Sequence, residues 1–534
     1  LLVGPVASVV GVGIGVLLAI GLKGLFDAFG ATIPEGPLTV LPRTVIVAMA
    51  VGLVVTLASA LIPARRAAKV PPVAALREAE QGDPRSLARR ALTGSVVTGL
   101  GLLLLLVGLF TGVDPAIAYV GFGAAILFVG VSILAPLFAR ALARGIGAPL
   151  PRVYGVTGTL ARENSIRRPR RTAATASALM VGVALVGFVA ILTSSIKGSV
   201  ATSITENFGA ADYQIEAAGF GDPSDPTFGV SPALADRLRA RPELAVVSQL
   251  RFGAWRRPGK ASERFLVGVD PDTIDRVYNL DLQEGDLGAL AEGGVLVSKN
   301  FAEDNELTVG SPLPMEFPLT GVGELEVVGI FAGEGLGDQF IALDTYQPRY
   351  SRRLDSMVLV KAADGVSPAD SRAAVDRVAA DFPNAEVSDH AEFIAKQESQ
   401  INIILSIFTA LLGLAILIAF LGIANTLALS IFERTREIGL LRAVGMSRRQ
   451  VRRMIRWEAV IIALFGAVLG VLIGSFLGWA VTAALADEGL SELSFPFGLL
   501  GIYVLVGAIG GILASIVPAY RGSRIKLLEA IAYE

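Results

Sequence analysis

The sequence predicts an α-helical integral membrane protein with one extracytoplasmic α/β domain. Its mean hydropathy of +0.62 over 534 residues is too high for a soluble globular chain. Apolar runs of membrane-spanning length alternate with charged connections along the chain. One long segment, 199–400, is instead rich in carboxylates and has the composition of a water-exposed domain.

Uncharged runs long enough to cross a bilayer occur eight times, which favours transmembrane helices over buried helices of a soluble protein. These runs are 3–22, 44–62, 92–110, 116–137, 173–191, 403–429, 459–486 and 498–517.

The connections between the runs alternate between basic and non-basic. Arginine and lysine gather after residue 62, in 140–171, in 434–456 and in the C-terminal tail, while the intervening connections are acidic or nearly uncharged. Because basic connections stay on the cytoplasmic side, this alternation predicts that both ends of the chain are cytoplasmic and that 199–400 is extracytoplasmic. We expect a multi-pass membrane protein.

Composition excludes several classes of chemistry. The chain has no cysteine, and His390 is its only histidine, which excludes thiolate sites and Ser-His-Asp catalysis. The carboxylates that follow Gly268 lack the spacing of a calcium-binding loop and are better explained as turns and helix caps. We therefore expect no catalytic residues, no cofactor or metal in this chain, and no nucleic-acid partner.

An internal repeat relates residues 1–78 to residues 456–533. The alignment needs no gap and places Gly11 on Gly466 and Pro63 on Pro518. Only the final helix pair of the first copy is present, so we expect the native protein to carry a further helix, exterior domain, helix and basic segment before Leu1. Such a protein would have ten spans.

The segment 199–400 alternates short β-rich runs with amphipathic helical runs, as expected of an α/β domain. Predicted strands are 212–217, 244–255, 263–269, 294–299, 325–332 and 356–362, and predicted helices are 231–241 and 367–382.

Two features inside the apolar runs are a stripe of glycines and a single polar amide. A glycine at every fourth position makes a bare stripe on one helix, formed by Gly466, Gly470, Gly474 and Gly478. Packing within the chain explains this stripe better than a dimer seam or a sliding surface.

Asn425 is expected to be a buried amide that bonds a neighbouring helix. Chains of intramembrane charges are absent from the sequence, which disfavours a proton- or sodium-coupled transporter.

The stretch "ERTREIGLLRAVGMSRRQ" interrupts two apolar runs with charge. It predicts a short helix that ends at Gly445, with Ile438 and Leu441 on one face and Leu440 and Val444 beside it. The arginines could serve only topology and the binding of anionic lipid headgroups. The apolar edge favours docking onto a cytoplasmic partner.

At this stretch the chain resembles a known family. "NTLALSIFERTREIGLLRAVGMSRRQV" and "PAYRGSRIKLLEAI" are similar to the cytoplasmic signature and final helix of FtsX-like/MacB-like ABC transporter permeases, in their duplicated, fused two-unit bacterial form. The resemblance implies that the exterior domain is of the MacB periplasmic-core type. It also implies a coupling helix that rests on an ATPase, to which it assigns Glu433, Arg434, Arg436, Glu437, Ile438, Leu441, Arg442 and Gly445.

The resemblance implies a division of the chain into parts. These are 1–80, the last helix pair of the first unit; 81–150, a linking helix pair; 151–198, an amphipathic elbow and first helix of the second unit; 199–400, the extracytoplasmic domain; and 401–534, the permease domain, with the coupling helix at 430–446.

The function that the resemblance implies is that of a permease subunit in the bacterial plasma (inner) membrane, driven by a separate cytoplasmic ABC ATPase dimer. The printed sequence has no G-x-x-x-x-G-K-[ST] phosphate loop, so ATP and magnesium are expected on that partner. Further expected partners are membrane lipids and an extracytoplasmic protein or lipoprotein. The work would be export or extraction of a lipid, lipoprotein or peptide, or regulation of a cell-wall partner. The alternative is a non-transporting receptor or scaffold that binds a ligand through its exterior domain.

Overall fold

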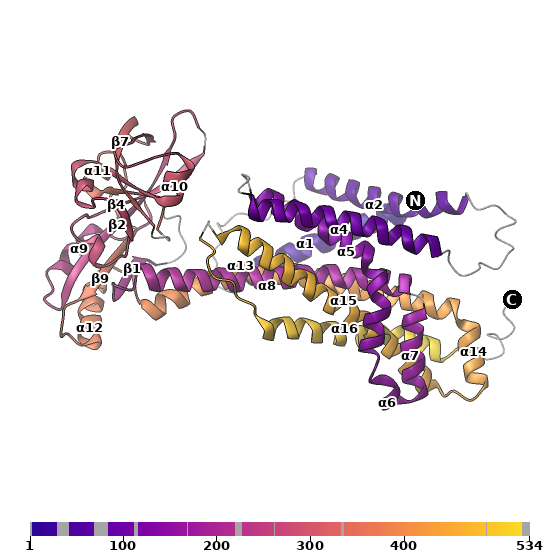
Figure 1. The fold of residues 1–534 in the computed structure, drawn as a ribbon. Helices are drawn as coiled ribbons and strands as arrows, with labels where there is room; N and C mark the ends of the chain where they lie inside the picture. The colour runs from indigo at the N-terminus through magenta and orange to yellow at the C-terminus, as the bar shows by residue number, and fades with distance from the viewer. Residues whose placement is uncertain are drawn as a thin grey trace. The chain divides into compact units, whose positions relative to one another are not determined.

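The structure, a computed structural model, describes residues 3–28, 42–68, 84–111, 116–167, 169–218, 227–260, 262–332, 336–486 and 489–525 (Figure 1). The chain forms two compact units. Unit 1 comprises Leu1–Val189, Ile403–Leu477 and Phe497–Glu534, and unit 2 comprises Ala190–Asn402 and Gly478–Pro496.

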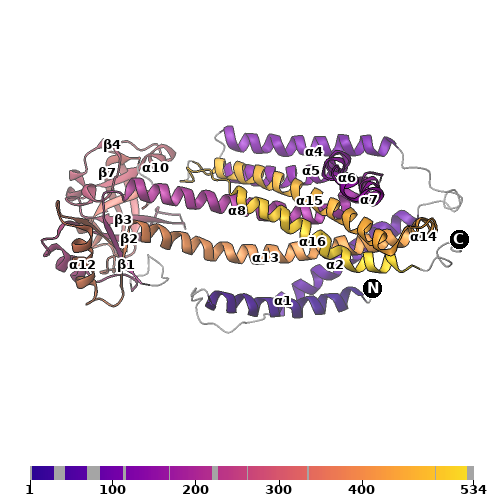
Figure 2. The ribbon, with the colours of Figure 1, turned by 90° about the horizontal axis from the view of Figure 1, so that it is seen from below.

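Unit 1 is built from helices. In chain order its elements are α1 (Val3–Ala28), α2 (Pro42–Ala68), α4 (Pro84–Phe110), α5 (Ala116–Ile146), α6 (Leu150–Tyr154), α7 (Val156–Arg167), the first part of α8 (Pro169–Asn207), most of α13 (His390–Glu433), α14 (Thr435–Ala443), most of α15 (Arg448–Ala484) and α16 (Phe497–Ser523). Each of α8 and α13 is a single continuous helix (Figure 2).

Seven helices in the described part of the chain are long and apolar enough to cross a membrane. They correspond to seven of the eight predicted runs. The eighth, 3–22, lies in α1, where the apolar stretch Pro5–Gly21 is shorter than the others. Helix α1 as a whole has 26 residues, which correspond to about 39 Å at 1.5 Å per residue.

The glycine stripe of α15 lies against α8 of the same chain. A Cβ atom on Gly466, Gly470 or Gly474 would lie 2.7, 2.8 or 2.3 Å from a backbone carbonyl oxygen of α8. On Gly478 it would lie 2.8 Å from the Ile191 side chain. Only glycine lets the two backbones approach this closely. At the corresponding Gly11 in α1, a Cβ atom would meet no described residue within 4 Å.

Unit 2 contains a 10-stranded mixed sheet with the order β10-β1-β9-β2-β3-β8-β5-β7-β4, and β6 pairs with β2 and β7. The strands are β1 (Tyr213–Ala217), β2 (Leu244–Arg256), β3 (Glu263–Val269), β4 (Leu282–Gly285), β5 (Val295–Ser298), β6 (Pro312–Phe317), β7 (Gly321–Phe331), β8 (Gln339–Ala342), β9 (Met357–Ala362) and β10 (Ala385–Asp389). Short helices accompany them: α9 (Pro232–Arg239), α10 (Lys299–Asp304), α11 (Leu343–Tyr346), α12 (Pro368–Ala379) and the 3₁₀ turns η1 (Ile274–Arg276) and η2 (Gly288–Glu292).

Strand β2 organises the sheet because its two halves have different partners. Its first half pairs with β9 and its second half with β3. At the change of partner the buried Arg251 donates a 2.8 Å hydrogen bond to Asp355, which also accepts from Gln249 at 2.6 Å. Burial raises the pKa of the Asp355 carboxyl, and the bonds from Arg251 and Gln249 oppose that rise.

All six predicted strands and both predicted helices of this unit are present. Strands β4, β6, β8 and β10 were not predicted. The segment of β4, LQEG, has a single apolar residue and therefore shows no strand pattern.

The contact between α15 and α8 predicts the effect of a bulky residue in the stripe. Gly474→Val should lower the melting temperature of the detergent-solubilised protein, by an amount equivalent to about 1–3 kcal/mol, because its side chain would overlap the Ala184 carbonyl group. Gly501→Val in α16 is the matched control, since nothing lies within 4 Å of a Cβ at that position. Equal shifts for the two variants would contradict this account of the packing.

Candidate functional site

The segment that joins α13 to α15 is held in one conformation by two local motifs. Helix α14 ends in a Schellman motif: the Gly445 N–H donates to the Arg442 carbonyl at 3.1 Å, and the Met446 N–H to the Leu441 carbonyl at 3.0 Å. Gly445 has φ +110°, a left-handed conformation that favours glycine. The predicted glycine stop is therefore present.

Helix α15 begins shortly afterwards with a capping box. The Gln450 N–H donates to Ser447 Oγ at 3.3 Å, and the Ser447 N–H donates to Gln450 Oε1 at 2.8 Å. The letters "GMSRRQ" thus specify one helix end and the next helix start, which leaves little freedom between α14 and α15.

The two faces of α14 have different environments. Ile438 is only 2% exposed and packs in a cluster with Ile431, Val451, Met454 and other apolar side chains of the chain itself. The expectation that Ile438 contributes to an edge offered to a partner is therefore wrong for this conformation, because its own chain covers it. The outward face instead presents Arg436, Leu440 and Val444, with Leu440 49% and Val444 89% exposed.

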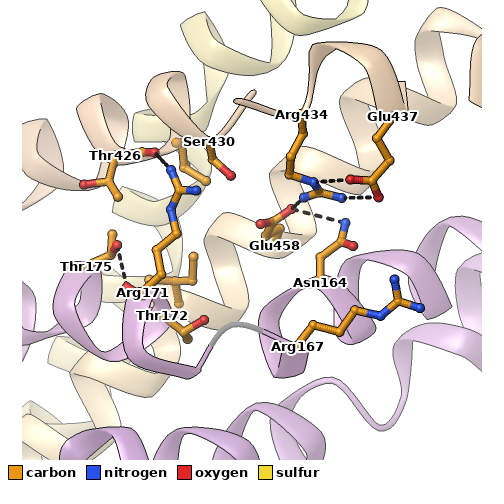
Figure 3. A pocket seen from close by; sticks show the side chains of 12 residues that line it. Asn164, Arg167, Arg171, Thr172, Thr175, Thr426, Ser430, Arg434, Glu437 and Glu458 are labelled. Atoms are coloured by element: carbon orange, nitrogen blue, oxygen red, sulfur yellow. Dashed lines mark hydrogen bonds and ion pairs between the residues drawn. The ribbon is translucent and has the colours of Figure 1, made fainter. Parts of the chain in front are cut away.

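Arg434, just before α14, is the centre of an ionic network (Figure 3). Its guanidinium donates two hydrogen bonds to Glu437, at 2.8 and 3.0 Å, and lies 3.5 Å from the carboxylate of Glu458 in α15. Burial acts to lower the pKa of Arg434, but the paired carboxylates of Glu437 and Glu458 raise it above its ordinary value. Arg434 therefore stays charged and joins the start of α14 to α15.

A second ion pair joins the end of α13 to the start of α8. Arg171 donates to Glu433 at 2.7 Å and to the Thr426 carbonyl at 2.9 Å. On the preceding elbow helix α7, Asn164 donates to Glu458 at 3.5 Å. The ion pairs and this hydrogen bond therefore connect α7, α8, α13, α14 and α15.

These side chains surround a small polar cavity of about 100 Å³. Asn164, Arg167 and Arg171 line it from the α7–α8 side, and Thr426, Ser430, Arg434 and Glu458 line it from the other side, as Figure 3 shows. Among the described residues, no group of three His, Asp or Glu side chains is arranged to hold a metal ion. The arrangement is suited to holding helices together.

The remaining predicted residues have separate positions. Arg442 donates to the backbone carbonyl of Ile525, and Leu441 is half-buried. Asn425, expected to be buried, is exposed on α13. The prediction of a buried amide is wrong for the described part of the chain, which leaves this side of α13 uncovered.

Sequence reasoning missed Arg171 and Glu458. Glu458 directly precedes the predicted span 459–486, and Arg171 lies two positions before the predicted span 173–191. A charge at the edge of an apolar run was available as a signal, but it does not identify the opposite charge that meets it.

Comparisons with known proteins assign domains to both units. Residues 409–527 match the FtsX-like permease C-terminal family, and residues 172–378 match the MacB-like periplasmic core domain. The sequence-based resemblance is therefore confirmed.

Several relatives match with low identity. An uncharacterized ABC transporter permease protein of Mycobacterium tuberculosis is 24% identical over 99% of this chain and 63% of its own length. A pyoverdine export ATP-binding/permease protein of Pseudomonas putida is 25% identical over 52% of this chain and 44% of its own length. A macrolide export ATP-binding/permease protein of Aeromonas hydrophila is 26% identical over 55% of this chain and 46% of its own length. The chain thus spans about half the length of the relatives it matches.

The ionic network predicts unequal effects for its two carboxylates. Glu458→Ala should destabilise the detergent-solubilised protein by about 1–3 kcal/mol, because it removes one carboxylate from a pair whose side chains are 11% and 12% exposed, while Arg434 keeps its bonds to Glu437. Glu437→Ala should cost less than about 1 kcal/mol, because that carboxylate is 48% exposed. Thermal unfolding measures the stability of both variants. A larger loss of stability for Glu437→Ala than for Glu458→Ala would contradict this expectation.

Proposed function

We propose that this chain, a member of the FtsX-like and MacB-like ABC transporter permeases, couples ATP hydrolysis by a separate cytoplasmic ATPase dimer to motion of its extracytoplasmic domain. ATP and magnesium would be bound by the ATPase, since the printed sequence has no phosphate loop. The basic connections support a plasma-membrane protein with α14 on the cytoplasmic side.

The observation that carries this proposal is the two-sided environment of α14. Its buried face and ionic network fix it to neighbouring helices, while Arg436, Leu440 and Val444 remain uncovered among the described residues. An exposed apolar pair beside a cation, on a short helix with defined ends, is suited to a groove in a partner protein. This face refines the residues expected to contact the ATPase, because Ile438 supports the helix from behind.

The helices next to α14 supply a route for motion. Helices α8 and α13 contain 39 and 44 residues, which correspond to about 58 and 66 Å at 1.5 Å per residue. Both exceed the ~30 Å hydrocarbon core, and both continue along the chain into the α/β unit. A displacement of α14 that reaches Glu433 or Arg171 would thus act on a helix that continues into that unit.

The substrate is proposed only as a class. Export or extraction of a lipid, lipoprotein or peptide, or regulation of a cell-wall partner, would each use motion of the exterior domain. The relatives named for pyoverdine and macrolide export support an export role. A receptor or scaffold would instead bind its ligand without any ATPase on α14.

Purification of the intact complex from its native membrane tests the proposal. We expect a co-purifying subunit with a phosphate loop and ATPase activity. Leu440→Glu and Val444→Glu should each reduce its recovery about tenfold or more, because a buried unpaired carboxylate is costly at an interface. Val153→Glu, at a position of α6 that is 66% exposed in the wild type, is the matched control.

Two results would contradict the proposal. One is an intact complex without any nucleotide-hydrolysing subunit, which would favour the receptor alternative. The other is unchanged ATPase recovery and activity in both α14 variants while the protein remains folded.

A further inference from the structure

We infer that unit 1 has a binding site for an anionic phospholipid where the arginine-bearing face of α15 enters the membrane. The site is an open cavity of about 460 Å³ between α6, α15 and α16. Its lining residues are Tyr154, Arg449, Arg452, Arg453, Arg456, Trp457, Val460 and Ile512. This inference requires α15 to span a membrane, but it does not require an ATPase.

Helical periodicity brings the four arginines together. Positions 449, 452, 453 and 456 follow i, i+3, i+4 and i+7 spacing, so they share one face of α15. The same face continues to Val460, where it becomes apolar. A lipid with a negative headgroup and acyl chains matches this order of charge followed by apolar surface.

The charge of the cluster is unbalanced. None of its arginines forms an ion pair with a carboxylate in the described part of the chain, and no Asp or Glu lines the cavity. Arg452 instead donates to the backbone carbonyl of Arg448 at 3.4 Å. Like charges this close repel one another, so an anion in the cavity would be stabilising.

Aromatic side chains set the depth of the site and hold one arginine in place. The Arg453 guanidinium lies 5.0 Å from the centre of the Tyr154 ring, and that ring lies 5.1 Å from the Trp457 ring. Tryptophan and tyrosine favour the membrane–water interface. The arginines therefore lie at headgroup level, while Ile512, which is 41% exposed, provides a surface for an acyl chain beside the buried Val460.

A phospholipid explains these features better than free phosphate does. Both ligands would pair with the arginines, but only a lipid would also contact the Tyr154 and Trp457 rings and the apolar lining residues Val460 and Ile512. An acidic protein segment would also leave these apolar lining residues without a ligand group to contact. The ligand we propose is therefore a glycerophospholipid with a net negative headgroup, and phosphatidylglycerol is a suitable probe.

Lipid binding to the purified intact protein tests this inference. In phosphatidylcholine nanodiscs, a small fraction of phosphatidylglycerol with brominated chains should quench Trp457 fluorescence more strongly than the same fraction of brominated phosphatidylcholine. Trp457→Phe identifies the quenched component among the three tryptophans of the chain. Equal quenching by the two lipids would by itself overturn the inference.

Native mass spectrometry of the detergent-solubilised protein measures the role of the arginines. The double variant Arg453→Gln/Arg456→Gln should weaken phosphatidylglycerol binding about tenfold or more, because each basic residue near an anionic surface contributes roughly a factor of five. Arg140→Gln/Arg144→Gln, at exposed positions of α5, is the matched control and should keep the wild-type affinity. Unchanged melting temperatures show that the variants are folded.

Further outcomes of this experiment decide against the site. An equal loss in the α5 control would show that general surface charge binds the lipid. Displacement of phosphatidylglycerol by millimolar inorganic phosphate would show that the cavity recognises a free anion. Persistence of full affinity in the Arg453/Arg456 variant would show that the lipid binds elsewhere.

Discussion

The pairing of Arg434 with Glu437 and Glu458 is the interaction on which the arrangement of unit 1 around α14 depends. Two of its three side chains are almost completely buried, so each would be costly without the others. The pairing also crosses element boundaries, because Arg434 precedes α14, Glu437 belongs to α14 and Glu458 belongs to α15. Any displacement of α14 must therefore either carry α15 along or separate these charges.

Helix α14 could not hold its shape without such contacts. With nine residues it is shorter than the roughly 12–15 residues that make an isolated helix even marginally stable in water. The Schellman motif at Gly445 fixes its end, and the burial of Ile438 fixes its orientation. Helix α14 is thus held in place by its surroundings, and its exposed face has a defined direction.

Sequence reasoning recovered what local pattern determines. Apolar run length identified seven of the described spans, and the glycine at position 445 identified the end of α14. Spacing alone did not reveal that Arg171 meets Glu433, because these residues lie 262 positions apart. The spacing of apolar residues also did not show which face of α14 is buried by the chain itself. A buried face and a partner-binding face have the same helical periodicity.

Helix α15 combines two features that bear on how motion would pass from α14 in the proposed mechanism. Near its start it holds Glu458, and along its length the glycine stripe contacts α8 at backbone distance. Because Gly474 leaves no room for even one additional methyl group, α15 cannot move toward α8 without displacing it. The route from α14 to α8 is therefore more direct through α15 than through the flexible side chain of Arg171, whose pair with Glu433 is partly open to solvent. On this argument, close backbone packing transmits the force, and the surface ion pair only keeps the end of α13 in register.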